Sequence, residues 1–309
     1  MDPAAVRAAR IKAQRLDRPP GSVTDLVRGI VALQAQDLKA ARLAVRARTN
    51  SLTPQDFDDA VASGALVRTW AMRGTLHLIA REDVGWIVTL LGPVNAEKGR
   101  RRRMQLGLDD DFCARAIDQL RDILVEPLGR KEIVRRLGER GIRLEGQMTP
   151  HLLGYAANLG IITAGDDSYE LLGTPKLKHG LPELVRRYMD AYGPATAEDF
   201  ATWSGLPLKQ VREVFPAELP EFEPAEPCVR LLGHFDPFLL GYRDRSAHLA
   251  AEHVSAIQTG GGFLTPHVLV NGEVRGTWTR RGKIIDLTPF GPIPQRPLKA
   301  EVDSLVTWY

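Results

Sequence analysis

Hydrophobic positions along the chain change from a helical to an alternating spacing, and the change occurs more than once. Segments with helical spacing occupy residues 4–62, and two β-rich runs, Leu66 to Trp70 and Thr75 to Ile79, follow them. The short connection between these runs predicts a hairpin. Helices followed by a β-hairpin are the order of a winged helix, so residues 1–104 are predicted to form the first one.

Capping residues mark where the helices of this first part begin. Ser22 and Thr53 are each followed by helix-favouring residues, and the helix that starts at Ser22 is predicted to reach Leu33. A further segment starts after Asp37 and runs to Arg48. Its apolar positions also alternate with arginines, so the spacing leaves helix and strand open for this segment.

The same order recurs in the second third of the chain. Residues 105–175 predict three helices and a hairpin around Gly165-Asp166-Asp167, which is a second winged helix. Residues 176–227 predict three more helices that end in a proline-rich acidic stretch, and we assign them to a third winged helix.

Residues 228–309 are rich in β-forming positions and close the chain. Asn271-Gly272 lies between two alternating runs and predicts a tight hairpin, because a type I′ turn needs positive φ at both positions. The predicted fold class is therefore α+β, with three tandem winged-helix motifs followed by a small β-barrel or twisted sheet.

Composition and charge exclude several classes of protein. The 41 Lys and Arg residues against 38 Asp and Glu give a net charge of only +3, so nucleic-acid affinity must come from local clusters. No window approaches 18 uninterrupted apolar residues, and no membrane segment is expected. Cys113 and Cys228 lack the spacing of a zinc site or disulfide framework, so a reducing cytoplasm is the expected location.

Two arginine clusters are candidate DNA contacts. The first lies between the first two predicted winged helices, where it could touch consecutive phosphates or form a solvated helix face. The second lies on or beside the C-terminal hairpins, which could enter a DNA groove, although such residues also protect sheet edges from aggregation. The residues concerned are Lys98, Arg100, Arg101, Arg102, Arg103, Arg275, Arg280 and Arg281.

Gln34 and Gln36 are the candidate catalytic side chains. Two neutral amides cannot form a metal site, a nucleophile or a titrating acid/base pair, but their donors and acceptors can fix the position and orientation of a water molecule. Asp37 could cap the next segment or share this water, and we favour the cap.

Other candidate chemistry is weaker. His77 could face a cleft beside the amide pair or be a buried structural histidine. The remaining histidines lie near acidic residues, but their spacing matches no metal-ligand motif, so no metal is expected. The sequence also lacks a serine-nucleophile motif and a phosphate-binding loop, and no cofactor is expected.

Four segments, in order along nearly the whole chain, resemble the AlkZ/YcaQ-like family of bacterial DNA glycosylases. They are Leu33-Gln-Ala-Gln-Asp37, Thr69-Trp-Ala-Met-Arg-Gly-Thr-Leu-His77, Phe235-Asp-Pro-Phe-Leu-Leu-Gly-Tyr-Arg-Asp-Arg245 and Pro266-His-Val-Leu-Val-Asn-Gly-Glu-Val-Arg-Gly-Thr-Trp278. Gln34 and Gln36 match the family's Gln-x-Gln motif and depart from its Gln-x-Asp branch.

This resemblance implies a monomeric enzyme that excises bulky N7-alkylated purines from double-stranded DNA, for repair or for self-resistance. It implies a cytoplasmic, nucleoid-associated protein whose winged helices form a C-shaped clamp with a C-terminal β-barrel. It implies catalytic roles for Gln34 and Gln36. Active-site support is expected from Asp37, Arg73, Thr75, His77 and Asp236, and further DNA contacts from Arg243 and Arg245.

The amide pair suits a leaving group that departs without being protonated by the enzyme. An N7-alkylated purine carries a positive charge that disappears when its glycosidic bond breaks, so no general acid is required. The enzyme then has to stabilise the sugar cation and place a water near C1′. Two alternatives stay open: a non-catalytic winged-helix regulator, which would normally bind DNA as a dimer, and a protein-interaction module.

Overall fold

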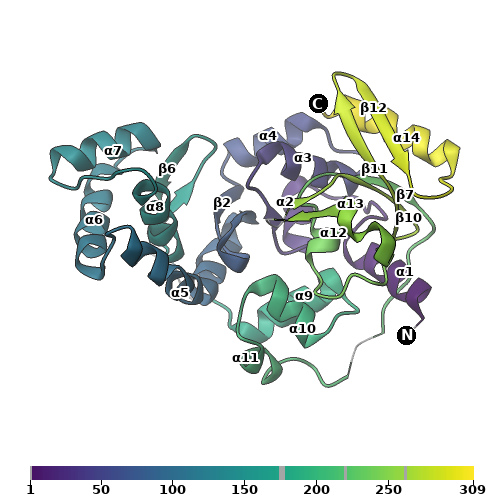
Figure 1. Cartoon of the computed structure of the whole chain (residues 1–309), viewed down its shortest axis with the longest axis horizontal. Helices are drawn as coiled ribbons and strands as arrows, with labels where there is room; N and C mark the ends of the chain where they lie inside the picture. Colours follow the sequence, from purple (N-terminus) through teal and green to yellow (C-terminus); the bar gives the residue numbers. More distant parts are fainter. Residues whose placement is uncertain (1, 174–177, 219–220, 261–262) are drawn as a thin grey trace.

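The first part of the chain contains the helices and the hairpin that the hydrophobic pattern predicts (Figure 1). The computed structural model describes residues 2–173, 178–218, 221–260 and 263–309. Ser22 and Thr53 each form a capping box at a helix start, as expected. The elements of this part are α1 (Pro3–Ala13), α2 (Val23–Gly29), β1 (Leu33–Gln34), α3 (Leu38–Ala47), α4 (Pro54–Ala62), β2 (Leu66–Trp70), the 3-10 turn η1 (Met72–Gly74) and β3 (Leu76–Ala80).

The segment after Asp37 is a helix, which resolves the ambiguity between helix and strand. Most residues of α3 are buried, including Arg46 on the same helix as Leu43. Because arginines such as Arg46 are buried, the alternation of apolar residues and arginines does not reflect exposure in this helix.

Gln34 lies on a strand and Gln36 in the bend that follows it, which corrects the prediction that both glutamines sit at the end of a helix. The helix α2 stops at Gly29, and Val31 takes a positive φ of 68° before the short strand β1. This strand pairs antiparallel with β3, with Gln34 opposite His77. The sheet therefore fixes the backbone of Gln34.

The first two predicted winged helices share one sheet. β2 pairs with β5 at Arg68 and Ala164, and the strand order of the resulting six-stranded sheet is β1-β3-β2-β5-β6-β4. Helix α5 connects the two parts over 25 residues. The second part, at the left of Figure 1, contains α5 (Arg81–Gln105), α6 (Asp110–Ile123), β4 (Leu128–Gly129), α7 (Arg130–Glu139), α8 (Met148–Asn158), β5 (Ile162–Ala164) and β6 (Ser168–Leu171).

The third predicted winged helix has its helices but no wing among the described residues. Its elements are α9 (Leu181–Tyr192), α10 (Ala197–Ser204) and α11 (Leu208–Arg212), and residues 178–218 and 221–227 contain no strand. The expectation of a third hairpin is therefore wrong for this part of the chain. The predicted boundary at residues 175 and 176 lies outside the described residues.

The C-terminal part forms an open sheet and not a closed barrel in its described strand pairings. The four-stranded sheet has the order β12-β11-β10-β7, and β8 and β9 form a separate ribbon. Asn271 and Gly272 have φ of 52° and 78°, which confirms the predicted tight turn. The elements are β7 (Val229–Leu232), α12 (Pro237–Leu240), η2 (Ala251–His253), α13 (Val254–Ile257), β8 (Gln258–Gly260), β9 (Phe263–Leu264), β10 (His267–Val270), β11 (Glu273–Arg281), β12 (Ile284–Pro289) and α14 (Gln295–Thr307).

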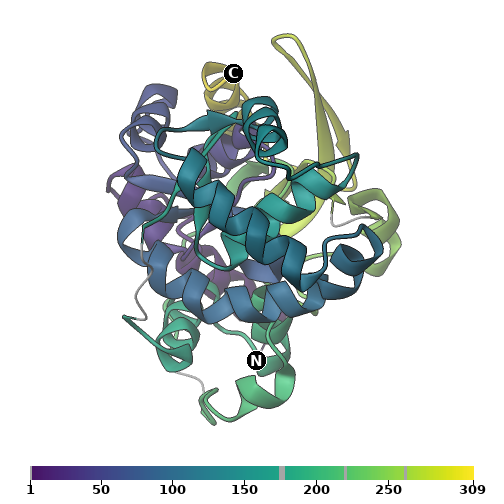
Figure 2. The same ribbon diagram turned by 90° about the vertical axis from the view of Figure 1, so that its left-hand side faces the viewer.

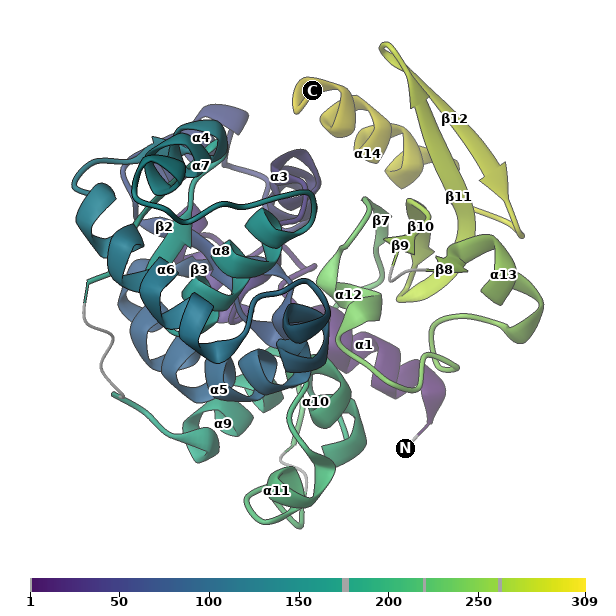
Figure 3. The same ribbon diagram turned by 60° about the vertical axis from the view of Figure 1, so that its left-hand side comes forward.

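The β11–β12 hairpin extends away from the body of the molecule (Figure 2). The first half of β11 pairs with β10, whereas the residues near the turn between β11 and β12 are exposed. Helix α14 lies beside it and near α3 (Figure 3). No helix in the described part of the chain is long and apolar enough to cross a membrane.

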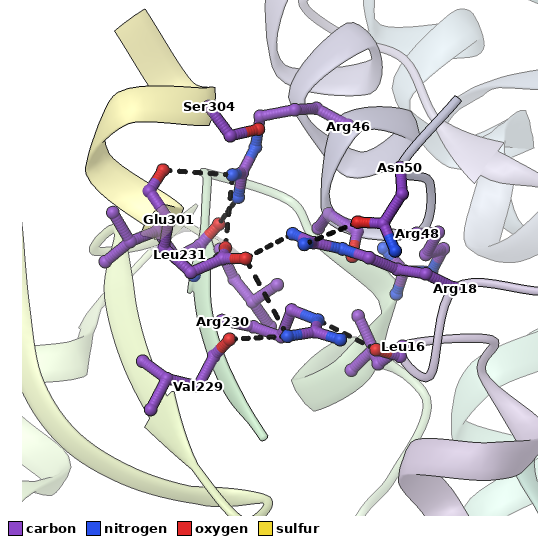
Figure 4. A network of polar contacts seen from close by, with 12 residues as sticks. Leu16, Arg18, Arg46, Arg48, Asn50, Val229, Arg230, Leu231, Glu301 and Ser304 are labelled. Carbon is purple, nitrogen blue, oxygen red and sulfur yellow. Dashed lines mark hydrogen bonds and ion pairs between the residues drawn. The ribbon is translucent and has the colours of Figure 1, made fainter. Parts of the chain in front are cut away.

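A buried polar network ties α14 to the helix that follows the glutamines (Figure 4). Glu301 on α14 is 2% exposed and forms ion pairs with Arg46, at 3.1 Å, and with Arg18. Arg230 lies 3.7 Å from the same carboxylate, which also accepts a 3.1 Å hydrogen bond from the backbone N of Leu231. One acidic side chain therefore links α14, α3, β7 and the segment after α1.

Candidate active site

The side chains of Gln34, Gln36 and Arg73 form a hydrogen-bonded chain. Gln34 donates from Nε2 to Oε1 of Gln36 at 2.6 Å, and Arg73 donates from Nη2 to Oε1 of Gln34 at 2.9 Å. Gln34 is 8% exposed and Gln36 is exposed. The structure therefore brings together two predicted catalytic residues and one predicted supporting residue, with the outer amide open to solvent.

Arg73 is held on both sides. Its Nη1 donates to the backbone oxygen of Trp203 at 2.6 Å, so the third part of the chain helps to orient it. Its backbone has a positive φ of 56° within the 3-10 turn between β2 and β3. Burial lowers the pKa of Arg73, as does the nearby charge of Arg245. Arg73 forms no ion pair with any described carboxylate.

His77 is a buried, neutral neighbour of the amide pair. It is 3% exposed, and its Nδ1 lies 2.9 Å from the backbone oxygen of Thr75. Burial lowers the pKa of His77 to about 3, with a smaller contribution from Arg73. The hydroxyl of Thr75 donates to the backbone oxygen of Met72 at 3.1 Å and so stabilises the turn that carries Arg73.

Asp37 and Asp236 have structural partners. Asp37 caps α3, and its Oδ1 accepts a 2.9 Å hydrogen bond from the backbone N of Lys39, which confirms the cap. Asp236 is fully buried and forms a two-point ion pair with Arg48, at 2.8 and 2.9 Å. The expectation that Asp236 supports the active site is therefore not met, because its carboxylate is occupied by Arg48 and by the backbone N of Phe238.

The basic run on α5 divides into exposed and buried members. Arg101 and Arg102 are exposed, whereas Arg100 pairs with Asp110 at 2.7 Å. Lys98 is exposed and donates to the backbone oxygen of Gly205. Arg103 corrects the expectation of a solvent-facing run, since it is 6% exposed and its guanidinium lies 3.8 Å from the ring centre of Tyr155.

The predicted DNA-binding residues of the C-terminal part lie at the surface. Arg275 pairs with Glu273, and Arg281 pairs with Asp286, each at 2.9 Å or less. Arg280 stacks on the ring of Tyr309 at 3.6 Å. Arg243 is exposed, whereas Arg245 is half-buried and donates to the backbone oxygen of Leu239 at 2.7 Å.

The site contains two contributors that sequence reasoning missed. The backbone oxygen of Trp203 comes from a different part of the chain, and no local signal marks it. The second contributor is Arg245, whose positive charge lowers the pKa of Arg73. In the sequence, its position in the Gly-Tyr-Arg-Asp-Arg segment suggested only a DNA contact. The described residues hold no group of three His, Cys, Asp or Glu side chains placed for a metal ion.

Comparisons with known proteins show to which family the chain belongs. A family model described as DNA glycosylase AlkZ-like matches residues 27–307. The interstrand DNA cross-link repair glycosylase of Streptomyces sahachiroi is 28% identical over 346 aligned positions, which cover 96% of this chain and 92% of that protein. The solved structure of Streptomyces sahachiroi DNA glycosylase AlkZ matches with a TM-score of 0.85 and 25% identity, over 99% of this chain and 96% of that one. The chain therefore belongs to the AlkZ-like family of DNA glycosylases and is itself such an enzyme.

Proposed function

We propose that this glycosylase hydrolyses the N-glycosidic bond of N7-alkylated purines in duplex DNA, with Gln34 and Gln36 holding the attacking water. The observation that carries this proposal is the 2.6 Å hydrogen bond between the two amides, together with the donation from Arg73 that orients it. This arrangement offers hydrogen-bonding groups at fixed positions and no group that changes protonation state near neutral pH.

The chemistry of the substrate matches what the site offers. When the bond from C1′ to N9 breaks, its electron pair moves onto the purine and cancels the positive charge introduced by N7 alkylation. The sugar cation that remains is attacked at C1′ by the oxygen of the water, and the proton released passes to solvent on the exposed side of Gln36. A site of two amides and a neutral His77 supplies position and polarity, which is sufficient for such a leaving group.

We propose a role in the repair of alkylated DNA, including self-resistance to an alkylating agent. Support comes from the name of the Streptomyces sahachiroi relative, an interstrand DNA cross-link repair glycosylase. Cross-linked duplexes are therefore a substrate class to test alongside single N7 adducts.

We further propose that the chain acts as a cytoplasmic, nucleoid-associated monomer that clamps the duplex. In this arrangement residues 1–104 and 105–175 act as two winged helices, residues 176–227 as a helical support and residues 228–309 as the hairpin-bearing part. The shared six-stranded sheet supports joint action of the first two. The exposed end of the β11–β12 hairpin, with Arg280 and Arg281, has the shape of a groove-entering ribbon.

The proposed reaction is tested by base release from a duplex that carries one N7-methylguanine. Wild-type protein is expected to release the base, and Gln34→Ala and Gln36→Ala are expected to lose this activity, because neither single amide can fix the water. Gln55→Ala is the matched control, since Gln55 is an exposed glutamine on α4 whose amide bonds only to Asp59 among the described residues. Wild-type inactivity on this duplex and on bulkier N7 adducts would reject the proposed substrate class.

A further inference from the structure

A pocket of about 410 Å³ next to the amide pair is lined by basic residues and by no acidic one. It lies between the turn that carries Arg73, helix α5 and helix α8. Three of its lining residues are cationic, and two are aromatic. The lining residues that the argument uses are Trp70, Arg73, Lys98, Arg103, Tyr155 and Asn158.

The positive charges of this pocket have no carboxylate partner among the described residues. Arg73, Lys98 and Arg103 donate only to oxygens of the backbone or of an amide, namely those of Trp203, Gln34, Gly205 and Ala96. Most other arginines of the protein, such as Arg186, pair with acidic side chains. A charge that is largely removed from water is costly unless a counter-charge compensates it. The lining of the pocket therefore favours an anionic ligand.

Arg103 is the most informative of the three residues. It is 6% exposed, its Nη1 donates to the backbone oxygen of Ala96 at 2.7 Å, and its guanidinium lies over Tyr155 at 3.8 Å. These contacts, together with the nearby thiol of Cys113, fix the guanidinium. A fixed, planar guanidinium is well suited to binding a phosphate at two points.

Asn158 gives a second and independent indication of a ligand. It is 8% exposed, and its Nδ2 donates to the backbone oxygen of Gly154 at 2.8 Å. Its buried Oδ1 has no hydrogen-bond partner among the described residues. Buried acceptors are almost always satisfied, and a phosphate diester has no hydrogen to donate, so a water that bridges this oxygen and the ligand is expected to donate here.

We propose that this pocket binds one phosphate group, held by Lys98 and Arg103. The inference rests on the proposed function in one respect, which is that we assign the phosphate to the DNA backbone beside the excised base. Arg73 supports this assignment, because it lines the pocket and also donates to Oε1 of Gln34. A phosphate bound here would fix the DNA strand with respect to the two amides. Free phosphate is the other source of the same chemistry.

Salt dependence of binding to an undamaged duplex tests the DNA assignment without requiring base release. The slope of log Kd against log salt concentration is expected to fall by about 0.9 for each phosphate contact removed. Lys98 and Arg103 share this one phosphate, so the double variant Lys98→Met/Arg103→Met is expected to reduce the slope of the wild type by about this amount and each single variant by part of it. Arg135→Met is the matched control, because Arg135 is an exposed arginine on α7 that pairs with Glu132 and Glu139.

The change in Tm on addition of inorganic phosphate tests whether the pocket binds free phosphate. If phosphate raises the Tm of the wild type above that in chloride of equal ionic strength, and does not do so in Arg103→Met, the pocket binds a free phosphate. Unchanged salt slopes in both variants together with no phosphate effect on Tm would overturn the proposal. Lys98 is exposed, so Lys98→Met keeps the test decisive if Arg103→Met does not fold.

The proposed reaction and the proposed phosphate site fail separately in this design. Reduced salt slopes with no base release from any N7 adduct would reject the proposed reaction and retain the phosphate site. Base release with unchanged salt slopes and no effect of phosphate on the Tm would reject the phosphate site and retain the proposed reaction.

Discussion

Arg73 determines which way the amides of Gln34 and Gln36 face. A guanidinium only donates hydrogen bonds, so the atom of Gln34 that faces Arg73 must be its oxygen. The nitrogen of Gln34 then faces Gln36 and donates to its oxygen. The amide hydrogens of Gln36 are consequently directed away from Gln34, where they can contact water.

Substitution of Arg73 is therefore expected to affect the chemical step. In Arg73→Met the amide of Gln34 can rotate, and we expect the single-turnover rate of base release at saturating protein to fall about 100-fold. Arg73→Lys retains the charge but cannot reach both Gln34 and Trp203 with a planar fork, so it is expected to recover only part of the rate. Single-turnover kinetics on an N7-methylguanine duplex give both the maximal rate and the half-saturating protein concentration.

The expected pattern distinguishes a positioning role from a structural one. The maximal rate should fall much more than the half-saturating concentration rises, at an unchanged Tm. An equal rate in Arg73→Met and wild type, or a loss explained wholly by unfolding, would contradict the role assigned to Arg73.

At the scale of single residues, local motifs in the sequence predicted which side chains contact one another better than they predicted which side chains are buried. The sequence placed Gln34, Gln36 and Arg73 in one site, and the structure brings their side chains together. It gave a different role to Asp236, expected to support the active site, and the wrong environment to Arg103, expected in a basic run at the surface. Their partners, Arg48 and Tyr155, lie 188 and 52 positions away along the chain, and no local pattern could reveal them.

At the scale of elements, α3 connects the active site to the C-terminal part. It begins directly after Asp37, and Arg46 and Arg48 near its other end form buried ion pairs with Glu301 and Asp236. These pairs anchor α3 against β7, α12 and α14. The position of Gln36 therefore depends on contacts far from the chemistry.

Removal of the charge of Glu301 is expected to destabilise the protein strongly. In Glu301→Gln the buried cations Arg18 and Arg46 lose their counter-charge, and we expect the free energy of unfolding to fall by about 3–5 kcal/mol. Lys299→Met on the same helix removes an exposed ion pair with Asp303. This substitution is expected to change the free energy of unfolding by less than about 1 kcal/mol. Urea denaturation of both variants measures the difference, and equal effects would contradict a dominant role of the buried network.

The boundaries of helices and strands could be predicted where capping residues and turns mark them. They could not be predicted where tertiary contacts determine them. Ser22, Thr53 and Asn271-Gly272 carry local signals that the structure confirms. β1 has two residues and thus no hydrophobic period of its own, so only its pairing with β3 reveals it. The merging of two hairpins into one sheet depends on a pairing between Arg68 and Ala164, which no local motif encodes.

At the scale of the whole molecule, the parts share their cores. One buried cluster joins residues of the first part, such as Met72, to Tyr188 and Trp203 of the third. Another joins Leu33 and Leu78 to Trp278 of the C-terminal part. The chain is therefore expected to unfold cooperatively, and groups buried in different parts contribute to one transition.

Buried neutral histidines are expected to give this transition a steep acid dependence. Burial lowers the pKa values of His77 and His248 to about 3, and it also lowers that of His267. In the unfolded chain these side chains titrate near their ordinary value of about 6.5. Between about pH 6.5 and 3 the unfolded state therefore binds protons that the folded state does not, so the free energy of unfolding decreases as the pH falls.

His248 provides the sharpest test, because its protonation is opposed by a direct contact. Its Nδ1 lies 2.7 Å from the backbone oxygen of Gly272 and its Nε2 lies 3.0 Å from Nη1 of Arg10. Arg10 can only donate, so Nε2 must keep its lone pair and the folded state must keep a neutral ring. In His248→Gln the nontitrating amide is expected to reduce the loss of unfolding free energy between pH 7 and 4, measured by urea denaturation at each pH. An identical pH dependence in variant and wild type would show that His248 contributes nothing to acid sensitivity.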